Sequence, residues 1–271
     1  MRKIANINTH IFKQPDLTWS LISDEAQAML DVYEAEGVAL AGVERSSMIT
    51  YVDAEVASGN HTLKDYETIY SLDGVNALID YIGSKTATAV NAPTQDINGY
   101  SFDGTTSYIN TNFNPSSEGV NYTQNDALVG VFVKVAVMDA TTRAIFANNG
   151  SPFIALTDNN SGNIVTYINQ VNAGIIIPPP SDISSSNLYS LSRINALRDS
   201  LFVNGIEKTA SVDRASSAPN NSTIKVASFG GSSQFFGGTI SSCIIGGSIG
   251  LNKIEQNTNL RNLLTSLGTL L

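Results

Sequence analysis

The stretch GYSFDGTTSYINTNFNP, residues 99–115, decides the fold. It holds two short apolar runs, around Tyr100 to Phe102 and around Tyr108 to Ile109, and the Asp103-Gly104 pair between them is a turn signal. A strand, a turn and a second strand within so short a stretch are typical of antiparallel sandwiches and barrels. This stretch therefore predicts an antiparallel β domain.

Short apolar runs separated by turn signals continue from this stretch to Ile245. The runs predict strands at Gly99–Phe102, Tyr108–Asn110, Ala127–Val137, Arg143–Asn148, Phe153–Thr157, Ile164–Asn169, Leu188–Asn195, Ser200–Val203, Ile206–Ala210, Ile224–Phe229 and Phe236–Ile245. The turn type of one connection between strands can be predicted. Asn204-Gly205 joins two runs, and both residues tolerate the positive φ that a type I′ hairpin turn requires.

Upstream of Gly83 the apolar residues recur at helical spacing. Ser23 is a plausible N-cap for a helix ending near Gly37, with Ala26 and Met29 on its apolar side. We predict helices over Ser23–Gly37, Ser47–Ala57 and Thr62–Leu72, a short turn or helix over Asn76–Gly83, and a helix after the sandwich over Leu251–Leu267. The predicted domains are a helical N-terminal region, 1–85, for attachment or oligomerisation, and a β-sandwich with a C-terminal helix, 86–271.

The composition limits the classes of partner. Charged residues are only 14% of the 271 residues, and the net charge is −9. Residues 1–90 alone carry a balance of −7, which repels phosphate backbones, so we expect no nucleic-acid binding through this region. Its acidic surface fits either a basic protein partner or a simple solvated helix face.

The single cysteine, the length of the apolar runs and the N-terminal residues indicate the cellular compartment. Cys243 is the only cysteine, which excludes an intrachain disulfide, and its apolar neighbours indicate a buried core residue. No run approaches the roughly 20 apolar residues that span a bilayer, so we expect no membrane insertion. The N-terminus lacks the apolar core of a signal peptide, which predicts synthesis in the cytoplasm without Sec-type export.

Three segments carry a resemblance to a fold family. Tyr100–Ile109 resembles the entry strands of concanavalin A/laminin-G-like domains, and Leu201–Glu207 resembles their central hairpin. Phe236–Ile245 is similar to their closing strand, which pairs back to the first strand. The resemblance covers roughly residues 97–267 and implies an antiparallel β-sandwich of the concanavalin A/laminin-G-like jelly-roll type, preceded here by a small helical region.

A narrower resemblance concerns residues 99–115 together with the run beginning at Tyr122. This arrangement, after a small helical region, is similar to structural modules of tailed bacteriophages, as head-fibre or tail-fibre and appendage components. The resemblance implies a virion protein made in the host cytoplasm, with other capsid or tail proteins as partners. It also implies a homo-oligomer, for which a trimer is favoured.

Catalytic chemistry has little support in the residue pattern. Glycosidases of this fold need two carboxylates facing one cleft, and no strand shows two acids at same-face spacing. His10 and His61 both precede the sandwich and have no partnered cysteine, and no nucleophile elbow or phosphate loop occurs. We therefore expect no enzyme and name no catalytic or cofactor-binding residue; a secreted enzyme subunit is the least favoured class.

A calcium ion is the one cofactor that the sequence leaves open. The segment Asp158–Asn163 offers hard oxygen ligands, and laminin-G-like domains often bind Ca²⁺ at a rim loop. The segment lacks the EF-hand arrangement, and such clusters serve more often as turns. The metal ligands, if any, stay unassigned.

Glycan binding is the main alternative to a purely structural role. The sandwich has no tryptophan, so a sugar would stack on another aromatic ring; the candidates are Tyr122, Tyr167, Tyr189, Phe235 and Phe236. Alternation along a strand makes Tyr167 and Tyr189 core or half-buried residues. It also requires one ring of Phe235-Phe236 to face outward, toward a ligand or a neighbouring subunit.

A further subunit contact is expected at the apolar loop of residues 175–180, which ends in three prolines. The sequence therefore predicts a structural component of a bacteriophage particle. A lectin-like adhesin or receptor-binding module that recognises a host-surface glycan is the alternative.

Overall fold

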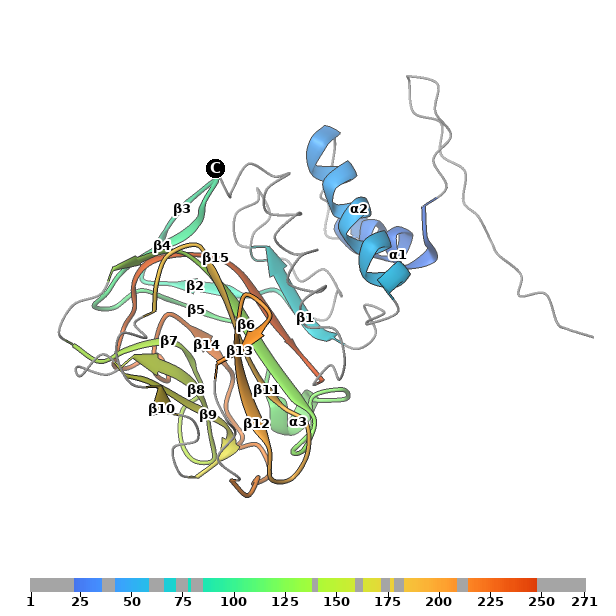
Figure 1. Cartoon of the computed structure of the whole chain (residues 1–271). Coiled ribbons are helices and arrows are strands. Elements are labelled where there is room, and N and C mark those ends of the chain that lie inside the picture. Colours follow the sequence, from blue (N-terminus) through green and yellow to red (C-terminus); the bar gives the residue numbers. More distant parts are fainter. Residues whose placement is uncertain are drawn as a thin grey trace, which may run out of the picture.

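The computed structural model describes residues 22–35, 42–58, 66–71, 78, 85–137, 141–158, 163–171, 176–177, 183–208 and 214–247. These residues form two antiparallel β-sheets packed face to face, with a pair of helices on one side (Figure 1). The predicted fold class, a mainly β antiparallel sandwich, is confirmed.

One sheet contains eight of the described strands, in the order β13-β12-β11-β6-β15-β4-β3, with β1 pairing beside β4 on β15. Its strands are β1 (Tyr66–Ser71), β3 (Thr94–Asp96), β4 (Gly99–Asp103), β6 (Ala127–Val137), β11 (Asn187–Arg193), β12 (Asp199–Val203), β13 (Ile206–Glu207) and β15 (Gly237–Gly246).

The other sheet contains seven of the described strands, in the order β10-β9-β8-β7-β14-β5-β2. Its strands are β2 (Thr88–Val90), β5 (Tyr108–Asn110), β7 (Arg143–Ala147), β8 (Phe153–Asp158), β9 (Ile164–Gln170), β10 (Ile176–Ile177) and β14 (Lys225–Val226). All pairings between these strands are antiparallel.

The core lies between the two sheets and is built by alternation. On β6, Val129, Val131 and Val133 face inward, and on β8 the inward residues are Ile154 and Leu156. Cys243 lies in this core and is fully buried, as its apolar neighbours predicted.

The predicted strands agree with the structure at their centres and differ at their ends. Both β5 and β6 have the predicted bounds, whereas β14 keeps only two residues of the predicted Ile224–Phe229. The hairpin turn is confirmed, with φ of 51° at Asn204 and 80° at Gly205. Strand β15 pairs with β4, as the resemblance to the fold family implied.

The first two predicted N-terminal helices are confirmed as α1 (Asp24–Ala35) and α2 (Gly42–Ser58), although α2 begins five residues before the predicted Ser47. Ser23 caps α1, because its hydroxyl accepts a hydrogen bond from the N–H of Ala26 at 3.1 Å. The carboxylate of Asp53, from α2, accepts from both the N–H and the hydroxyl of Ser23, so the second helix fixes the start of the first.

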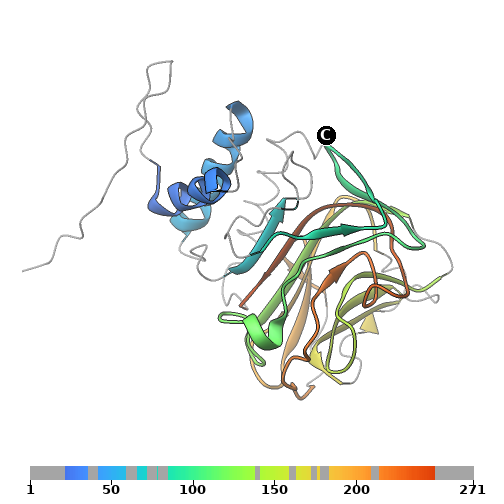
Figure 2. The same cartoon turned by 180° about the vertical axis from the view of Figure 1, so that it is seen from behind.

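The helix predicted over Thr62–Leu72 is wrong, because its described part, Tyr66–Ser71, is strand β1. This strand pairs antiparallel with β15 from Tyr66↔Gly246 to Ser71↔Ser242. The edge of β15 offers backbone hydrogen bonds that an isolated helical turn cannot match. Helices α1 and α2 lie beside β1 in both views (Figures 1 and 2). The division at residues 85 and 86 stays a prediction.

A short helix that the sequence analysis missed follows β5. Helix α3 (Pro115–Glu118) has Asn114 as N-cap, whose side chain accepts from the N–H of Ser116 at 3.1 Å. Asparagine followed by proline at the first helical position is a recognisable signal for this helix start.

Several predicted segments lie outside the described residues. They are the C-terminal helix over Leu251–Leu267, both histidines, most of the predicted turn or helix over residues 76–83, and the predicted loop over residues 175–180 apart from strand β10. Within the described ranges, none of the helices combines the length and apolarity required to traverse a lipid bilayer.

The two sheets differ in how their outer faces are covered. On the eight-stranded sheet, Leu128, Phe132, Leu188 and Ile244 alternate with the core-facing residues, and each is at most 2% exposed. Residues 127–133 of β6 are therefore buried on both faces. On the seven-stranded sheet the outer side chains of Phe153, Val165 and Tyr167 are instead partly exposed, so this sheet presents the more accessible face.

A buried arginine joins the two sheets. Arg193 of β11 donates from Nε to the carbonyl oxygen of Ile168 at 2.7 Å and from Nη2 to Oε1 of Gln170 at 2.6 Å, both on β9. Its cross-strand partner is Asp199, which is also fully buried. Burial lowers the pKa of Arg193 and raises the pKa of Asp199, while the opposite charge of each group partly offsets the shift in the other.

Candidate functional site: an aromatic face on the seven-stranded sheet

The candidate site lies on the outer face of the seven-stranded sheet. Ile154 and Leu156 of β8 point into the core, so Phe153 and Ala155 point outward by alternation. On β9, Ile164 and Ile168 point inward, which places Tyr167 on the outer face. Ala155 and Tyr167 are direct cross-strand partners, so their side chains are neighbours on this face.

Three buried alanines form the base of this face. Ala144, Ala147 and Ala155 form a cluster separate from the main core, and the rings of Tyr167 and Phe229 pack against it. Small side chains on neighbouring strands leave room for aromatic rings to lie across the sheet. The rings shield the alanines and are themselves half-buried, so each ring keeps a side in contact with solvent.

Phe153, Tyr167 and Phe229, together with the three alanines, are called the aromatic face below. The centroid of the Phe153 ring lies 5.4 Å from that of Tyr167, in an edge-to-face arrangement, and 5.7 Å from that of Phe229. Contacts of this kind between aromatic rings stabilise their orientation beyond simple area burial. The three rings therefore form a semi-rigid apolar surface drawn from two strands and a loop.

A second aromatic pair extends the surface. Tyr108 of β5 and Phe235 are both half-buried, with ring centroids 6.4 Å apart. Gly231 lies beneath the Tyr108 ring with φ of +80°, and a Cβ there would come within 2.9 Å of the ring. Phe235 also pairs with Ala144 through an isolated bridge, which connects this pair to the base of the aromatic face.

Polar side chains border the face at the loop after β7. Asn149 is exposed, and its side chain lies within about 3 Å of the position that a Cβ on Gly230 would occupy. Asn220 holds the backbone of this loop, because its Nδ2 donates to the carbonyl oxygens of Asn149 at 3.0 Å and Gly150 at 2.5 Å. Asn148 donates to Oδ1 of Asn220 at 3.0 Å. The exposed Asn149 is thus held next to Gly230, the residue that follows Phe229 in the chain.

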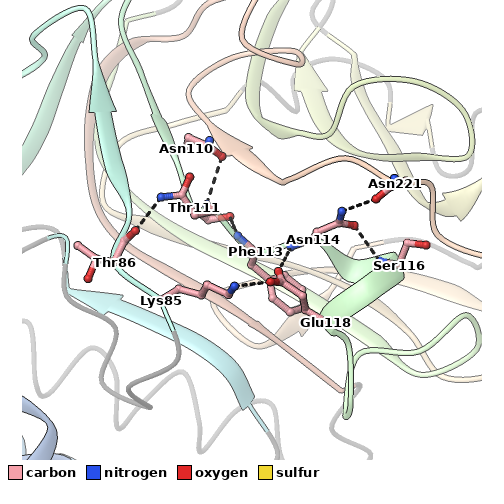
Figure 3. A network of polar contacts seen from close by, with 10 residues as sticks. Lys85, Thr86, Asn110, Thr111, Phe113, Asn114, Ser116, Glu118 and Asn221 are labelled. Atoms are coloured by element: carbon pink, nitrogen blue, oxygen red, sulfur yellow. Dashed lines mark hydrogen bonds and ion pairs between the residues drawn. The ribbon is translucent and has the colours of Figure 1, made fainter.

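A second polar network, shown in Figure 3, holds the segment at Lys85, where the chain enters the sandwich, against helix α3. Lys85 forms an ion pair with Glu118, whose other oxygen accepts from the N–H of Asn114 at 2.7 Å. Burial raises the pKa of Glu118, but the hydrogen bonds from Lys85 and Asn114 outweigh it and lower the pKa overall. Nδ2 of Asn114 donates to Oδ1 of Asn221 at 2.5 Å. All these groups have partners, so the network is structural.

The predicted aromatic candidates divide into core and surface residues. Tyr122 and Tyr189 are each 1% exposed and cannot stack on a ligand. Tyr167 is half-buried, as predicted, and it belongs to the aromatic face. The two rings of Phe235-Phe236 point to opposite sides: Phe236 is fully buried, and Phe235 is the half-exposed one.

Tyr122 has a structural role inside the sandwich. Its hydroxyl donates to Oδ1 of Asn169 at 3.0 Å, and Nδ2 of Asn169 donates to the carbonyl oxygens of Thr123 and Gln124. Burial raises the pKa of Tyr122 far above its usual range, although the charge of Arg193 and the contact with Asn169 act against the shift.

The possible calcium segment is only partly described. Asp158 is 2% exposed at the end of β8, and residues 159–162 lie outside the described residues. Among the residues that the structure describes, no three His, Cys, Asp or Glu side chains come together as a metal site would require. The calcium ion stays a prediction.

Sequence reasoning missed Phe153 and Phe229 as members of a site. Phe153 contacts both Tyr167 and Phe229 only after β8, β9 and the loop following β14 come together. The available signal was the alternation of Phe153 with the apolar residues Ile154 and Leu156 of β8.

The comparisons with known proteins define the class of fold. No family model matches this chain, and no curated protein matches its sequence. A Trypanosoma rangeli sialidase in complex with 2,3-difluorosialic acid matches with a TM-score of 0.54 and 16% identity, over 79% of this chain and 37% of the sialidase. A mutant of that sialidase displaying trans-sialidase activity matches with a TM-score of 0.53 and 14% identity, over 80% and 39%.

A third solved structure, an HCR/D mutant, matches with a TM-score of 0.53 and 14% identity, over 73% of this chain and 52% of that chain. The chain therefore spans well under two thirds of each of these proteins. At these identities the likeness establishes the fold, a concanavalin-like β-sandwich of the kind found in these sialidase structures.

The expectation that this chain is not an enzyme is overturned by these neighbours. They are sialidases and a mutant with trans-sialidase activity, which indicates a glycosidase-like fold. Same-face spacing along one strand detects only carboxylate pairs within that strand. A sandwich also brings together acids from different strands and loops, and spacing along one strand does not test such pairs.

Proposed function

We propose that this chain is a carbohydrate-binding β-sandwich module whose glycan lies on the aromatic face. The observation that carries the proposal is the set of three half-buried rings: Tyr167 and Phe229 pack over alanines of the accessible sheet, and Phe153 contacts both of them. The C–H face of a sugar ring stacks on such rings, and ligand sites combine an apolar surface with a few placed polar groups. Asn149, which is exposed next to Gly230 after Phe229, is a candidate polar group of this kind.

The structural neighbours support carbohydrate as the ligand class. The matched sialidase structure contains 2,3-difluorosialic acid, a sugar derivative, although the likeness covers only 37% of that chain. The open face of the seven-stranded sheet gives a glycan room to bind without displacing core residues. The buried outer face of β6 on the opposite sheet does not.

A glycan array with the full-length protein tests this proposal, with and without Ca²⁺. We expect a defined set of oligosaccharides to bind and Tyr167→Ala to weaken their affinity by about tenfold or more. Phe202→Ala is the matched control, because Phe202 is a half-buried ring on β12 of the other sheet. Absence of any glycan binding, or equal loss in both variants, would overturn the proposal.

The same oligosaccharides are then incubated with the protein, and released sugar is measured, because the fold is shared with sialidases. Release that the wild-type protein catalyses would place the reaction beside the glycan site. Binding without release would define a carbohydrate-binding module.

We propose a bacteriophage particle as the setting for this module. The observation that favours it is the resemblance of residues 99–115 and the following strand to phage head-fibre and tail-fibre modules. On this proposal α1 and α2 provide attachment or trimer contacts, other virion proteins are the partners, and the sandwich faces outward toward host-surface glycans. Multi-angle light scattering on the full chain tests the assembly. A trimer supports the proposal, and a monomer at micromolar concentration contradicts it.

A further inference from the structure

Lys225 lies next to the aromatic face by register. It is the direct cross-strand partner of Ala147, Ala147 is the partner of Ala155, and Ala155 is the partner of Tyr167. Residues directly opposite each other in antiparallel strands place their side chains on the same face. Lys225, two alanines and Tyr167 thus form one row across four neighbouring strands.

The ammonium group of Lys225 has only neutral partners. Its Nζ donates to the carbonyl oxygen of Thr223 at 2.9 Å and to the Thr223 hydroxyl at 2.6 Å. An ammonium group has three N–H donors, so one remains. Among the described residues no carboxylate lies within ion-pair distance of Lys225. Its side chain is half-buried, and this burial lowers its pKa.

A partly desolvated cation without a counter-charge favours an anionic ligand. The protein as a whole carries a net charge of −9, so long-range attraction does not bring anions to it. A local cation next to an apolar surface is therefore the feature that would select a ligand combining a carboxylate with sugar rings. The other residues of the row are two alanines and a tyrosine, and none of them is a carboxylate.

The length of the row sets the size of the ligand. Tyr167 lies three strands away from Lys225, which is about 14 Å at the usual strand spacing. A single sugar cannot contact both residues, whereas a short oligosaccharide can lie across the rings with one end at the ammonium group.

We infer that the aromatic face binds an acidic oligosaccharide, whose carboxylate meets Lys225 while its sugar rings stack on Tyr167 and Phe153. This inference rests on the proposed function and adds the class of glycan. The charged contact supplies the preference between acidic and neutral glycans, and the rings supply affinity for both.

The test uses the full-length protein and two pairs of probes that differ in the carboxylate. One pair is sialyllactose and lactose, and the other is trigalacturonate and its methyl ester. We expect the wild-type protein to bind at least one acidic probe about tenfold more tightly than its neutral counterpart, because charge-assisted hydrogen bonds are strong. Raising the salt concentration should reduce this preference.

Lys225→Gln should remove the preference and leave the affinity for the neutral probe unchanged. Lys134→Gln is the matched control, because Lys134 is a half-buried lysine on β6 of the other sheet. Circular dichroism and the melting temperature establish that both variants are folded. If Lys225→Gln does not fold, the salt dependence of the wild-type preference decides the question.

The outcomes separate this inference from the proposed function. Equal binding of acidic and neutral probes, lost in Tyr167→Ala, overturns the role of Lys225 and keeps the glycan module. An acidic preference that persists in Lys225→Gln also overturns it. Failure of the protein to bind any glycan, on the array or among these probes, overturns both.

Discussion

At the scale of single residues, Asp103 organises the turn that joins β4 to β5. Its Oδ1 accepts hydrogen bonds from the N–H groups of Thr105, Thr106 and Ser107 at 2.8, 2.8 and 3.0 Å. Its Oδ2 accepts from the Thr106 hydroxyl at 2.7 Å. Partial desolvation raises the pKa of Asp103, but these hydrogen bonds outweigh it and hold the pKa well below its usual range.

Replacing this carboxylate should weaken the fold in a pH-dependent way. Because the folded-state pKa of Asp103 lies below its unfolded value, its stabilising contribution is complete above that value and is lost as the pH falls below about 4. We expect Asp103→Ala to lower the free energy of unfolding by about 1–2 kcal/mol at pH 7 and by less at pH 3. Urea denaturation at both pH values measures the difference. An equal effect at both would contradict the role of the charge.

Arg193 is a second residue whose removal should be costly. Arg193→Met leaves Asp199 buried without its opposite charge and removes the contacts to Ile168 and Gln170. We expect a loss of about 3–5 kcal/mol in the free energy of unfolding.

The control for Arg193 is Arg198→Met, because Arg198 forms a surface ion pair with Glu207 at 3.3 Å and is 46% exposed. We expect it to cost at most about 1 kcal/mol. Similar urea midpoints for the two variants would show that the buried arginine does not join the sheets energetically.

At the scale of elements, the hairpin between β12 and β13 depends on its turn residues. Gly205 has φ of 80°, a conformation that costs an L-residue about 1–2 kcal/mol. Gly205→Ala should therefore lower the free energy of unfolding by about that amount. Gly237→Ala is the control, because a Cβ there meets nothing closer than 3.6 Å. If both variants melt at the same temperature, the turn conformation does not limit stability.

Much of the element pattern could be predicted from the sequence, because alternation and turn residues are local signals. The β12–β13 turn at Asn204-Gly205 and the 11 residues of β6 agree with the prediction. Strand β1 could not be predicted, because Tyr66, Ile69 and Tyr70 also fit a helical spacing. The strand conformation of this segment results from its pairing with the edge of β15, which is distant in the sequence.

The aromatic face was beyond prediction for a related reason. Tyr167 could be named as half-buried from its own strand, but no local pattern shows that Phe153 contacts both Tyr167 and Phe229. The register between strands also places Lys225 beside Ala147, and no spacing along one strand contains that information. Sites built across strands become visible only when the sheet order is known.

At the scale of the whole molecule, the N-terminal region and the sandwich share a sheet. Strands β4 and β1 pair with successive parts of the same edge of β15, so the sheet is incomplete without β1. Removing β1 would leave the β15 edge unpaired from Ser242 to Gly246. Unpaired edges of this kind favour aggregation.

Two truncations test this dependence. A chain that starts at residue 60 keeps β1, and a chain that starts at Thr86 loses it. We expect the shorter chain to melt about 5 °C or more below the longer one, because the ladder between β1 and β15 is lost. Differential scanning calorimetry measures both. Equal melting temperatures would show that β1 adds little and that the sandwich begins near residue 86.

The pairing of β1 with β15 also has a mechanical consequence. If the helices α1 and α2 are the anchored end, a pull on the displayed sandwich passes through β1. The ladder from Tyr66↔Gly246 to Ser71↔Ser242 spreads that load over several backbone hydrogen bonds of the central strand. Tension on a sandwich that is bound to a surface ligand would then reach the helices through the sheet that contains β1. The peptide linker that follows β1 would not carry this tension alone.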